Sequence, residues 1–148
     1  MSKKILVIRF SSIGDIVLTT PVIRCLRSQL NAEVHYLTKP AFADIVLSNP
    51  YVSKVITLSD QIESTIMMLK EENYDHIIDL HHNLRSARIK LALKRPSTSF
   101  SKLNFEKWLI VNFKVIRLPQ KHIVDRYFET VAALSCRNDQ KGLDFVIP

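Results

Sequence analysis

The run KILVIRFSSIGD, residues 4–15, joins a short apolar segment to a polar turn. Residues 4–10 are rich in Ile, Leu and Val, as expected for a parallel strand that is buried on both faces. The turn leads into a helix predicted over residues 16–30. Pro21 lies inside that helix, so we expect a kink or a restart, with Thr20 as the cap and Pro21 at the first helical position. The run therefore predicts a strand, a polar loop and a helix in succession.

The same alternation of strand and helix continues along the chain. Further strands are predicted at residues 33–38, 54–58, 75–80 and 97–101, and further helices at 40–48, 60–72 (capped by Ser59 or Asp60), 83–94, 104–113 and 122–134. Repeated βα units imply a parallel sheet with helices on both faces and right-handed crossovers. With 148 residues the chain has the size of one domain. The prediction is a single α/β domain, residues 1–148, with a parallel sheet covered by helices on both faces.

Composition narrows the class of partner. Hydrophobic residues make up 47% of the chain and charged residues 24%, which is typical of a globular domain. Twenty-one Lys and Arg against fourteen Asp and Glu give a net charge of +7, which favours an anionic partner. The basic residues are dispersed, without the dense basic helix of many nucleic-acid binders, so we expect no nucleic acid. Cys25 and Cys136 have no metal or redox spacing, and we expect two free thiols in a reducing cytoplasm.

The loop after the first predicted strand carries polar groups where a parallel sheet binds its ligands. Ser11 and Ser12 supply hydroxyls there, and Gly14 allows a tight turn and close approach of a ligand to the backbone. Asp15 is either a carboxylate held at the strand ends for chemistry or a helix cap. The loop matches neither the Gly-rich dinucleotide fingerprint nor the P-loop, which disfavours dinucleotide binding and ATP hydrolysis.

The loop after the fourth predicted strand is a second candidate site. In the run DLHHNLRS, residues 79–86, the side chains of Asn83, Arg85 and Ser86 open the next helix and are suited to an anionic or hydroxyl-rich ligand. Arg88 follows one helical turn after Arg85. The alternative is a solvated helix start with a basic outer face. The two adjacent histidines lack the further ligands of a recognisable zinc set, so we expect no metal.

A third candidate lies on the last predicted helix. His122 and Arg126 are one turn apart and share a face, with Asp125 and Glu129 beside them. Surface ion pairs at helical spacing are the alternative to a binding role. No Gly-x-Ser-x-Gly elbow occurs in the chain, which disfavours a hydrolase of that type.

Three segments together resemble one known family. Residues 4–21 are very close to the opening of the heptosyltransferases, glycosyltransferase family nine. Residues 79–86 resemble the second motif of that family, an acidic residue, a short polar turn and a basic residue followed by Ser. Residues 121–127 resemble the segment that precedes the crossover between the two domains of the family. Their order and their spread over most of the chain make the resemblance specific.

The resemblance implies a GT-B architecture, in which two Rossmann-like domains face each other across a cleft. This chain would be the N-terminal, acceptor-binding half, and the C-terminal donor-binding domain would be absent from it, so the chain alone is expected to be inactive. The implied reaction is an inverting, metal-independent transfer of heptose from ADP-heptose to the inner core of lipopolysaccharide, without a cofactor. Asp15 would be the general base. The implied location is the cytoplasm, peripherally at the inner face of the cytoplasmic membrane.

The residues expected to contact the anionic acceptor come from the two candidate loops and from the last predicted helix. They are Ser11, Ser12, Gly14, Asn83, Arg85, Ser86, Arg88, His122 and Arg126. A different class of function stays open beside the enzyme: a non-catalytic module, truncated and without activity, that binds an anionic glycan or a nucleotide.

Overall fold

A computed structural model describes residues 3–99, 124, 127–134 and 136–143. In this part of the chain five parallel strands form one sheet in the order β3-β2-β1-β4-β5. The strands are β1 (Lys4–Ile8), β2 (Glu33–Thr38), β3 (Lys54–Thr57), β4 (His76–Asp79) and β5 (Ser97–Ser99). The predicted fold class, a parallel sheet in an α/β domain, is confirmed.

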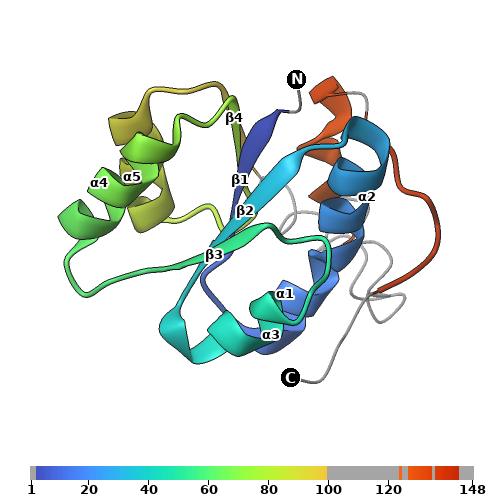
Figure 1. The fold of residues 1–148 in the computed structure, drawn as a ribbon, viewed down its shortest axis with the longest axis horizontal. Helices are drawn as coiled ribbons and strands as arrows, with labels where there is room; N and C mark the ends of the chain where they lie inside the picture. The colour runs from blue at the N-terminus through green and yellow to red at the C-terminus, as the bar shows by residue number, and fades with distance from the viewer. Residues whose placement is uncertain (1–2, 100–123, 125–126, 135, 144–148) are drawn as a thin grey trace, which may run out of the picture.

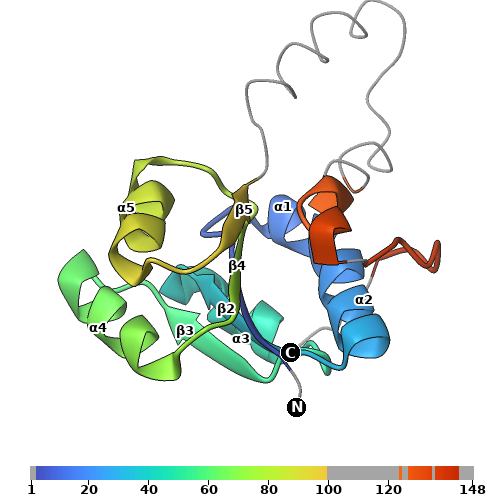
Figure 2. The same cartoon turned by 90° about the horizontal axis from the view of Figure 1, so that it is seen from above.

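Helices cover both faces of the sheet (Figures 1 and 2). The α-helices are α1 (Ile13–Leu18), α2 (Thr20–Leu30), α3 (Ala43–Leu47), α4 (Ile62–Glu72) and α5 (Leu84–Leu93), with short 3₁₀ helices η1 (Pro40–Phe42) and η2 (Ala132–Leu134). Side chains of α1, α2 and α3 share one core with side chains from the C-terminal part of the described chain, whereas α4 and α5 contribute to a second core on the other face. The C-terminal members of the first core are Val124, Tyr127, Phe128, Val131 and Cys136. The segment around η2 therefore lies on the same side as α2.

The apolar run of β1 explains its central position. Ile5 and Val7 belong to the first core, and Leu6 and Ile8 belong to the second. All four are fully buried, because successive side chains of a strand point to opposite faces. Each side chain of this size contributes about 1.5–3 kcal/mol when it is buried. The prediction of a strand buried on both faces is confirmed.

The predicted break near Pro21 is confirmed, with a different cap. The helix expected over residues 16–30 is two helices, because Thr19 ends α1 and begins α2. Thr20 is the first residue of α2, so the expectation of Thr20 as the cap is wrong by one position. The Thr19 hydroxyl donates to the Ile16 carbonyl (2.6 Å) and lies 2.9 Å from the Tyr36 hydroxyl. These bonds fix the junction inside the core.

The start of α4 also differs from the expectation. Gln61 is its N-cap, and neither Ser59 nor Asp60 occupies that position. The Ser59 hydroxyl donates to the Gln61 carbonyl (2.5 Å), and the Ser59 amide donates to the Thr65 hydroxyl (3.0 Å). Ser59 is thus used in the turn that precedes the helix.

The last predicted helix lies only partly in the described residues. Val124, Tyr127, Phe128 and Val131 are buried in the first core, and Leu134 packs against it. The predicted apolar stripe is therefore confirmed at these positions. The helix predicted at 104–113 lies outside the described residues. No helix in the described part of the chain is both long and apolar enough to span a membrane.

The segment after η2 is fastened to α2. Arg24 donates two hydrogen bonds to the Asp139 carboxylate, at 2.9 and 2.7 Å. The side-chain amide of Gln29 donates to the Arg137 carbonyl (2.5 Å) and accepts from the Arg137 amide (2.8 Å). Cys25 and Cys136 are buried free thiols, and burial raises the pKa of both.

Candidate functional site

The loops after β1 and β4 meet at the carboxyl edge of the sheet. The two strands are neighbours, but the chain leaves them toward opposite faces: α1 and α2 follow β1 on one face, and α5 follows β4 on the other. Figure 2 shows this divergence. A crevice at such a switch point is the general binding position of open parallel sheets. The first two candidate loops of the sequence thus form one site.

Arg9 joins these two loops. Its Nη1 donates to the Leu80 carbonyl (2.8 Å), and its Nη2 lies 3.0 Å from Oδ2 of Asp15. The Arg9 side chain is only 14% exposed. Because guanidinium stays charged at any physiological pH, the two loops share one permanent, partly buried cation. Burial raises the pKa of the Tyr36 and Tyr127 hydroxyls, to about 12 for Tyr127. The positive charge of Arg9 acts on both pKa values in the opposite direction.

The Asp15 carboxylate has two differently used oxygens. Oδ2 accepts from the Ser12 hydroxyl (2.9 Å) and faces the Ser12 amide (3.4 Å), which completes a capping box at the start of α1. The same oxygen also faces Arg9. Within the described residues no partner is recorded for Oδ1, and the Asp15 side chain is 39% exposed. The capping role, one of the two alternatives from the sequence, is therefore present on Oδ2, and a role of the carboxylate in chemistry stays a prediction.

The remaining polar residues of the first loop have separate places. Ser12 is exposed and its hydroxyl bonds Asp15, whereas Ser11 is half-buried. Gly14 lies within α1 without a positive φ, and a Cβ added there meets nothing within 4 Å. The turn therefore does not use the left-handed conformation that a glycine at this position would allow. The open space leaves the predicted close approach of a ligand as a prediction.

The β4 loop is shaped by a buried carboxylate. Asp79 is fully buried, and its Oδ1 accepts from the amides of His81 (3.0 Å) and His82 (2.8 Å). Lys90 of α5 brings its ammonium within 3.0 Å of Oδ2 and also donates to the Ser99 hydroxyl of β5 (2.5 Å). A buried charge must be paired to be tolerated, and this pair fixes the loop to the sheet.

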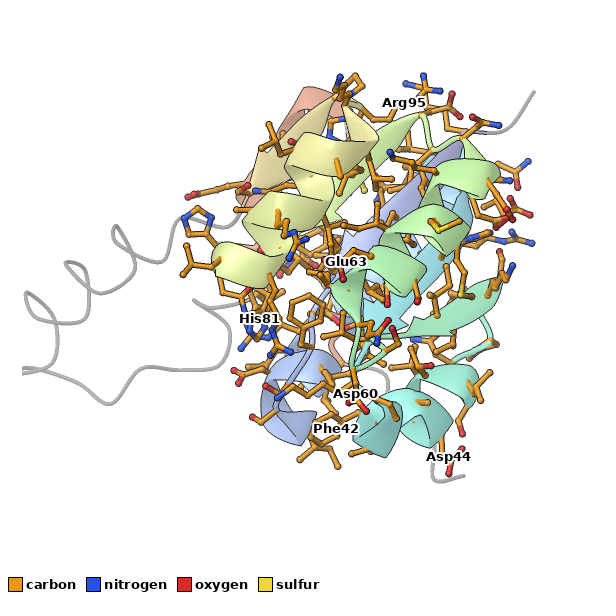
Figure 3. The ribbon with its side chains drawn as sticks, turned by 90° about the vertical axis from the view of Figure 1, so that its left-hand side faces the viewer. Phe42, Asp44, Asp60, Glu63, His81 and Arg95 are labelled. Carbon is orange, nitrogen blue, oxygen red and sulfur yellow. The ribbon has the colours of Figure 1, made fainter. Side chains whose placement is uncertain are left out.

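Aromatic and cationic groups stack between the two loops. The His81 ring lies 4.9 Å from the Phe10 ring, centroid to centroid, and its Nδ1 accepts weakly from the Phe10 amide (3.4 Å). The Arg85 guanidinium lies 5.3 Å from the centroid of the Phe10 ring, within cation–π range. In Figure 3, His81 and Asp60 lie toward the end of the molecule where Phe42 also lies, and Arg95 lies at the opposite end.

The residues predicted at the start of α5 divide into two roles. Asn83 is the N-cap: its Oδ1 accepts from the Ser86 amide (2.8 Å), and the Ser86 hydroxyl accepts from the Asn83 amide (2.9 Å). Ser86 is fully buried and also donates to the Asn83 carbonyl (3.0 Å). The geometry therefore gives the Ser86 side chain a capping role and no surface for the predicted acceptor contact. Arg85 is exposed and points over Phe10.

Arg88 differs from Arg85 in having a carboxylate partner. Its guanidinium pairs with Glu63 of α4, whereas no acidic partner of Arg85 is found among the described residues. A shallow groove of about 470 Å³ lies between the starts of α4 and α5, lined by Asp60, Gln61, Ile62, Glu63, Leu84, Arg85 and Arg88. The contact of Arg85 and Arg88 with an acceptor stays a prediction. His122 and Arg126 lie outside the described residues.

Five residues of the site were not predicted from the sequence as site residues: Arg9, Phe10, Asp79, His81 and Lys90. Arg9 and Asp79 had a signal, since each is a charged residue at the end of a run of apolar strand residues. Across the parts of the chain that are described, no three His, Cys, Asp or Glu side chains are grouped to hold a metal ion.

Comparison with known proteins assigns the chain to a family. The family model described as glycosyltransferase family 9 (heptosyltransferase) matches residues 62–144, which is more than half of the chain. The chain belongs to glycosyltransferase family 9. It is 26% identical over 117 residues to lipopolysaccharide heptosyltransferase 1 from Campylobacter coli, a match that covers 74% of this chain and 34% of the relative. The family 9 chain thus spans about a third of the length of that relative.

Solved structures of a family 9 glycosyl transferase and of two heptosyltransferases share the fold. A glycosyl transferase family 9 protein from Veillonella parvula matches with a TM-score of 0.73 at 22% identity, covering 100% of this chain and 46% of the other. The E. coli heptosyltransferase WaaC, solved with ADP, matches with a TM-score of 0.68 at 21% identity, covering 95% and 50%. ADP-heptose lipopolysaccharide heptosyltransferase II from E. coli gives 0.66 at 22% identity, covering 86% and 39%. The described domain corresponds to part of each of these longer chains.

Proposed function

We propose that this chain is the acceptor-binding side of an inverting glycosyltransferase that transfers heptose from ADP-heptose to the inner core of lipopolysaccharide. Membership of family 9 supports transfer of this type. The observation that carries the proposal is the Asp15 carboxylate, which is held through Oδ2 at the switch point of the sheet, while its side chain is 39% exposed and Oδ1 has no partner among the described residues. A second half, of GT-B type, would bind the nucleotide-sugar across the crevice.

The proposed chemistry is a single displacement at the anomeric carbon of the donor. The acceptor hydroxyl attacks that carbon and passes its proton to Oδ1 of Asp15, while the bond to the ADP leaving group breaks. Oδ2 is already engaged by Ser12 and Arg9, so it holds the carboxylate in place. We include metal independence in the proposal, as the resemblance to family 9 implies.

The anionic acceptor would meet Arg85. This guanidinium is exposed, lies beside the two loops and has no acidic partner among the described residues. The net charge of +7 also favours an acceptor that carries phosphate and carboxylate groups. We place the reaction at the inner face of the cytoplasmic membrane, where such a glycolipid acceptor is presented, with the protein bound peripherally.

The test is transfer from ADP-heptose to an inner-core acceptor by the complete enzyme that contains this chain and a donor-binding half. Asp15→Asn is expected to lower kcat by ~10²–10⁴-fold, the usual contribution of a positioned general base. Asn retains an oxygen for the bonds from Ser12, so thermal stability and acceptor affinity should change little. Asp44→Asn, an exposed carboxylate on α3, is the matched control and should leave kcat unchanged.

Two results would contradict the proposal. Near-normal turnover in Asp15→Asn would remove the base from the mechanism. Acceptor binding without transfer by the intact wild-type enzyme would favour the non-catalytic glycan-binding module instead.

A further inference from the structure

The charged end of the Arg9 side chain contacts both loops of the site. Its Nη1 reaches the Leu80 carbonyl after β4, and its Nη2 reaches Oδ2 of Asp15 after β1. The guanidinium is planar and rigid, so these two contacts fix the two loops at one separation and orientation. A flexible ammonium would supply the charge without this fixed geometry.

The Leu80 end of this connection is itself rigid. The Leu80 amide donates to the Ile8 carbonyl (3.0 Å), and the next two amides donate to buried Asp79. Asp79 is paired with Lys90, which anchors the loop to α5. The Leu80 carbonyl is therefore a fixed acceptor. Because the same guanidinium contacts this carbonyl and Asp15, the position of the carbonyl constrains the position of the Asp15 carboxylate.

The Asp15 end has a chemical consequence. Oδ2 faces the Ser12 hydroxyl and the Arg9 cation, so an added proton there would compete with donors already in place. Oδ1 has no such donors in the described part of the chain. A carboxylate with one oxygen fixed in this way presents the other in a single direction, which is what a general base requires.

We propose that Arg9 is a positioning residue that fixes Asp15 against the β4 loop through the Leu80 carbonyl, so that Oδ1 takes the proton of the acceptor. This inference rests on the proposed function of Asp15. It adds a residue that acts through Asp15 and not on the substrate. Arg9 is 14% exposed on its side chain, which fits a role beneath the site.

The structural part of the proposal is tested on this chain by the amide NMR signals of Arg9→Met. Met keeps the length of the aliphatic stem and removes the charged fork. We expect shifts at residues 12–15 and also at residues 80–82, because both ends of the bridge are released. Arg95→Met is the matched control, since Arg95 lies at the opposite end of the molecule (Figure 3). Shifts confined to β1 and its own loop would overturn the bridge.

The functional part is tested by a double-mutant cycle on the complete enzyme. Arg9→Met alone should lower kcat by about 10–100-fold, the scale of a small misplacement of a catalytic group, with the acceptor KM changed less than about threefold. In the Asp15→Asn background the same change should lower kcat by less than about threefold more, because Arg9 acts through a carboxylate that is already gone. A purely structural role would lower kcat equally in both backgrounds.

The cycle separates the two hypotheses. Normal turnover in Asp15→Asn sinks the proposed base, and with it the role of Arg9. The Arg9 proposal alone is contradicted when Asp15→Asn lowers kcat strongly and Arg9→Met has normal turnover. It is contradicted in the same way when Arg9→Met lowers kcat equally in the wild-type and Asp15→Asn backgrounds. In both cases the proposed role of Asp15 as the base remains. If thermal melting shows that Arg9→Met is unfolded, Arg9→Lys, which keeps the charge but not the planar fork, passes through the same cycle with the same expected non-additivity.

Discussion

The pair formed by Arg24 and Asp139 fastens residues 136–143 to α2, and removing its carboxylate should destabilise the domain. Arg24 is 6% exposed and lies on the buried side of α2. Its two hydrogen bonds to Asp139 have the side-by-side geometry of strong Arg–carboxylate pairs. Asp139→Asn keeps the shape and one acceptor oxygen, but removes the charge and one of the two bonds.

The magnitude follows from these contacts. A hydrogen bond to a charged group contributes about 1.5–3 kcal/mol, and the Asp139 side chain is only 18% exposed, so solvent screens the pair weakly. We expect a loss of about 2 kcal/mol in the free energy of unfolding. For a domain of this size that corresponds to a fall in Tm of about 4–8 °C. Asp44→Asn, with an exposed carboxylate, should change stability by less than about 0.5 kcal/mol.

The stabilisation by Asp139 depends on pH, and the direction of this dependence follows from its pKa. Hydrogen bonding to Arg24 holds the pKa of Asp139 far below its usual range, so the unfolded chain takes up this proton at a higher pH than the folded chain does. The stabilisation is therefore fully present above about pH 5 and is lost as the pH falls below about 4. Urea unfolding of wild type and Asp139→Asn at pH 7 and pH 3 measures it. The difference between the two proteins should shrink at pH 3.

Two outcomes would refute this reasoning. One is a difference of less than about 0.5 kcal/mol at pH 7, which would make the pair equivalent to an exposed ion pair. The other is a difference that is the same at both pH values, because the cause would then be packing and not charge.

Two further predictions concern the start of α5. Asn83→Ala should lower the free energy of unfolding by about 1 kcal/mol in urea denaturation, because it removes the side-chain oxygen that caps the Ser86 amide. Asn83→Asp caps equally well and should lower the free energy of unfolding much less. Equal losses in both variants would contradict the capping role. Arg85→Glu should weaken binding of an anionic inner-core oligosaccharide by at least about tenfold at low salt in isothermal titration, and the wild-type affinity should fall as salt is added. Arg95→Glu is the matched control. An affinity that is unchanged by Arg85→Glu would exclude Arg85 from the acceptor site.

Much of the fold was predictable because local patterns of apolar residues and proline determine it. The apolar run of β1 has no polar side to expose, so it must be covered on both faces, and the following βα units supply the covering helices. The break before Pro21 follows from the missing amide hydrogen of proline. The boundaries were less predictable, as at Thr19 and Gln61, because competing hydrogen bonds of nearby hydroxyls determine which residue begins a helix.

The candidate site was predictable only in part. The sequence indicated Asp15 and Arg85, because polar residues after parallel strands gather at one edge of the sheet. It also indicated Ser86, whose burial in the α5 cap is a consequence of how the helix packs on the sheet. The sequence could not show that Asp15 forms a capping box, since a capping residue and the proposed general base call for the same residue at the same position.

The sequence by itself determined the two-sided strand, the helices that follow it and the polar loop that ends in Asp15. The tertiary structure alone decided that Arg9 would meet the Leu80 carbonyl, 71 residues away in the chain. That contact exists because β4 lies beside β1 in the sheet, with Ile8 in register with Asp79. Strand order and register are set by packing of the whole sheet against its helices. Local sequence specifies which segments become strands. Which strands lie side by side depends on how the helices pack against both faces of the complete sheet.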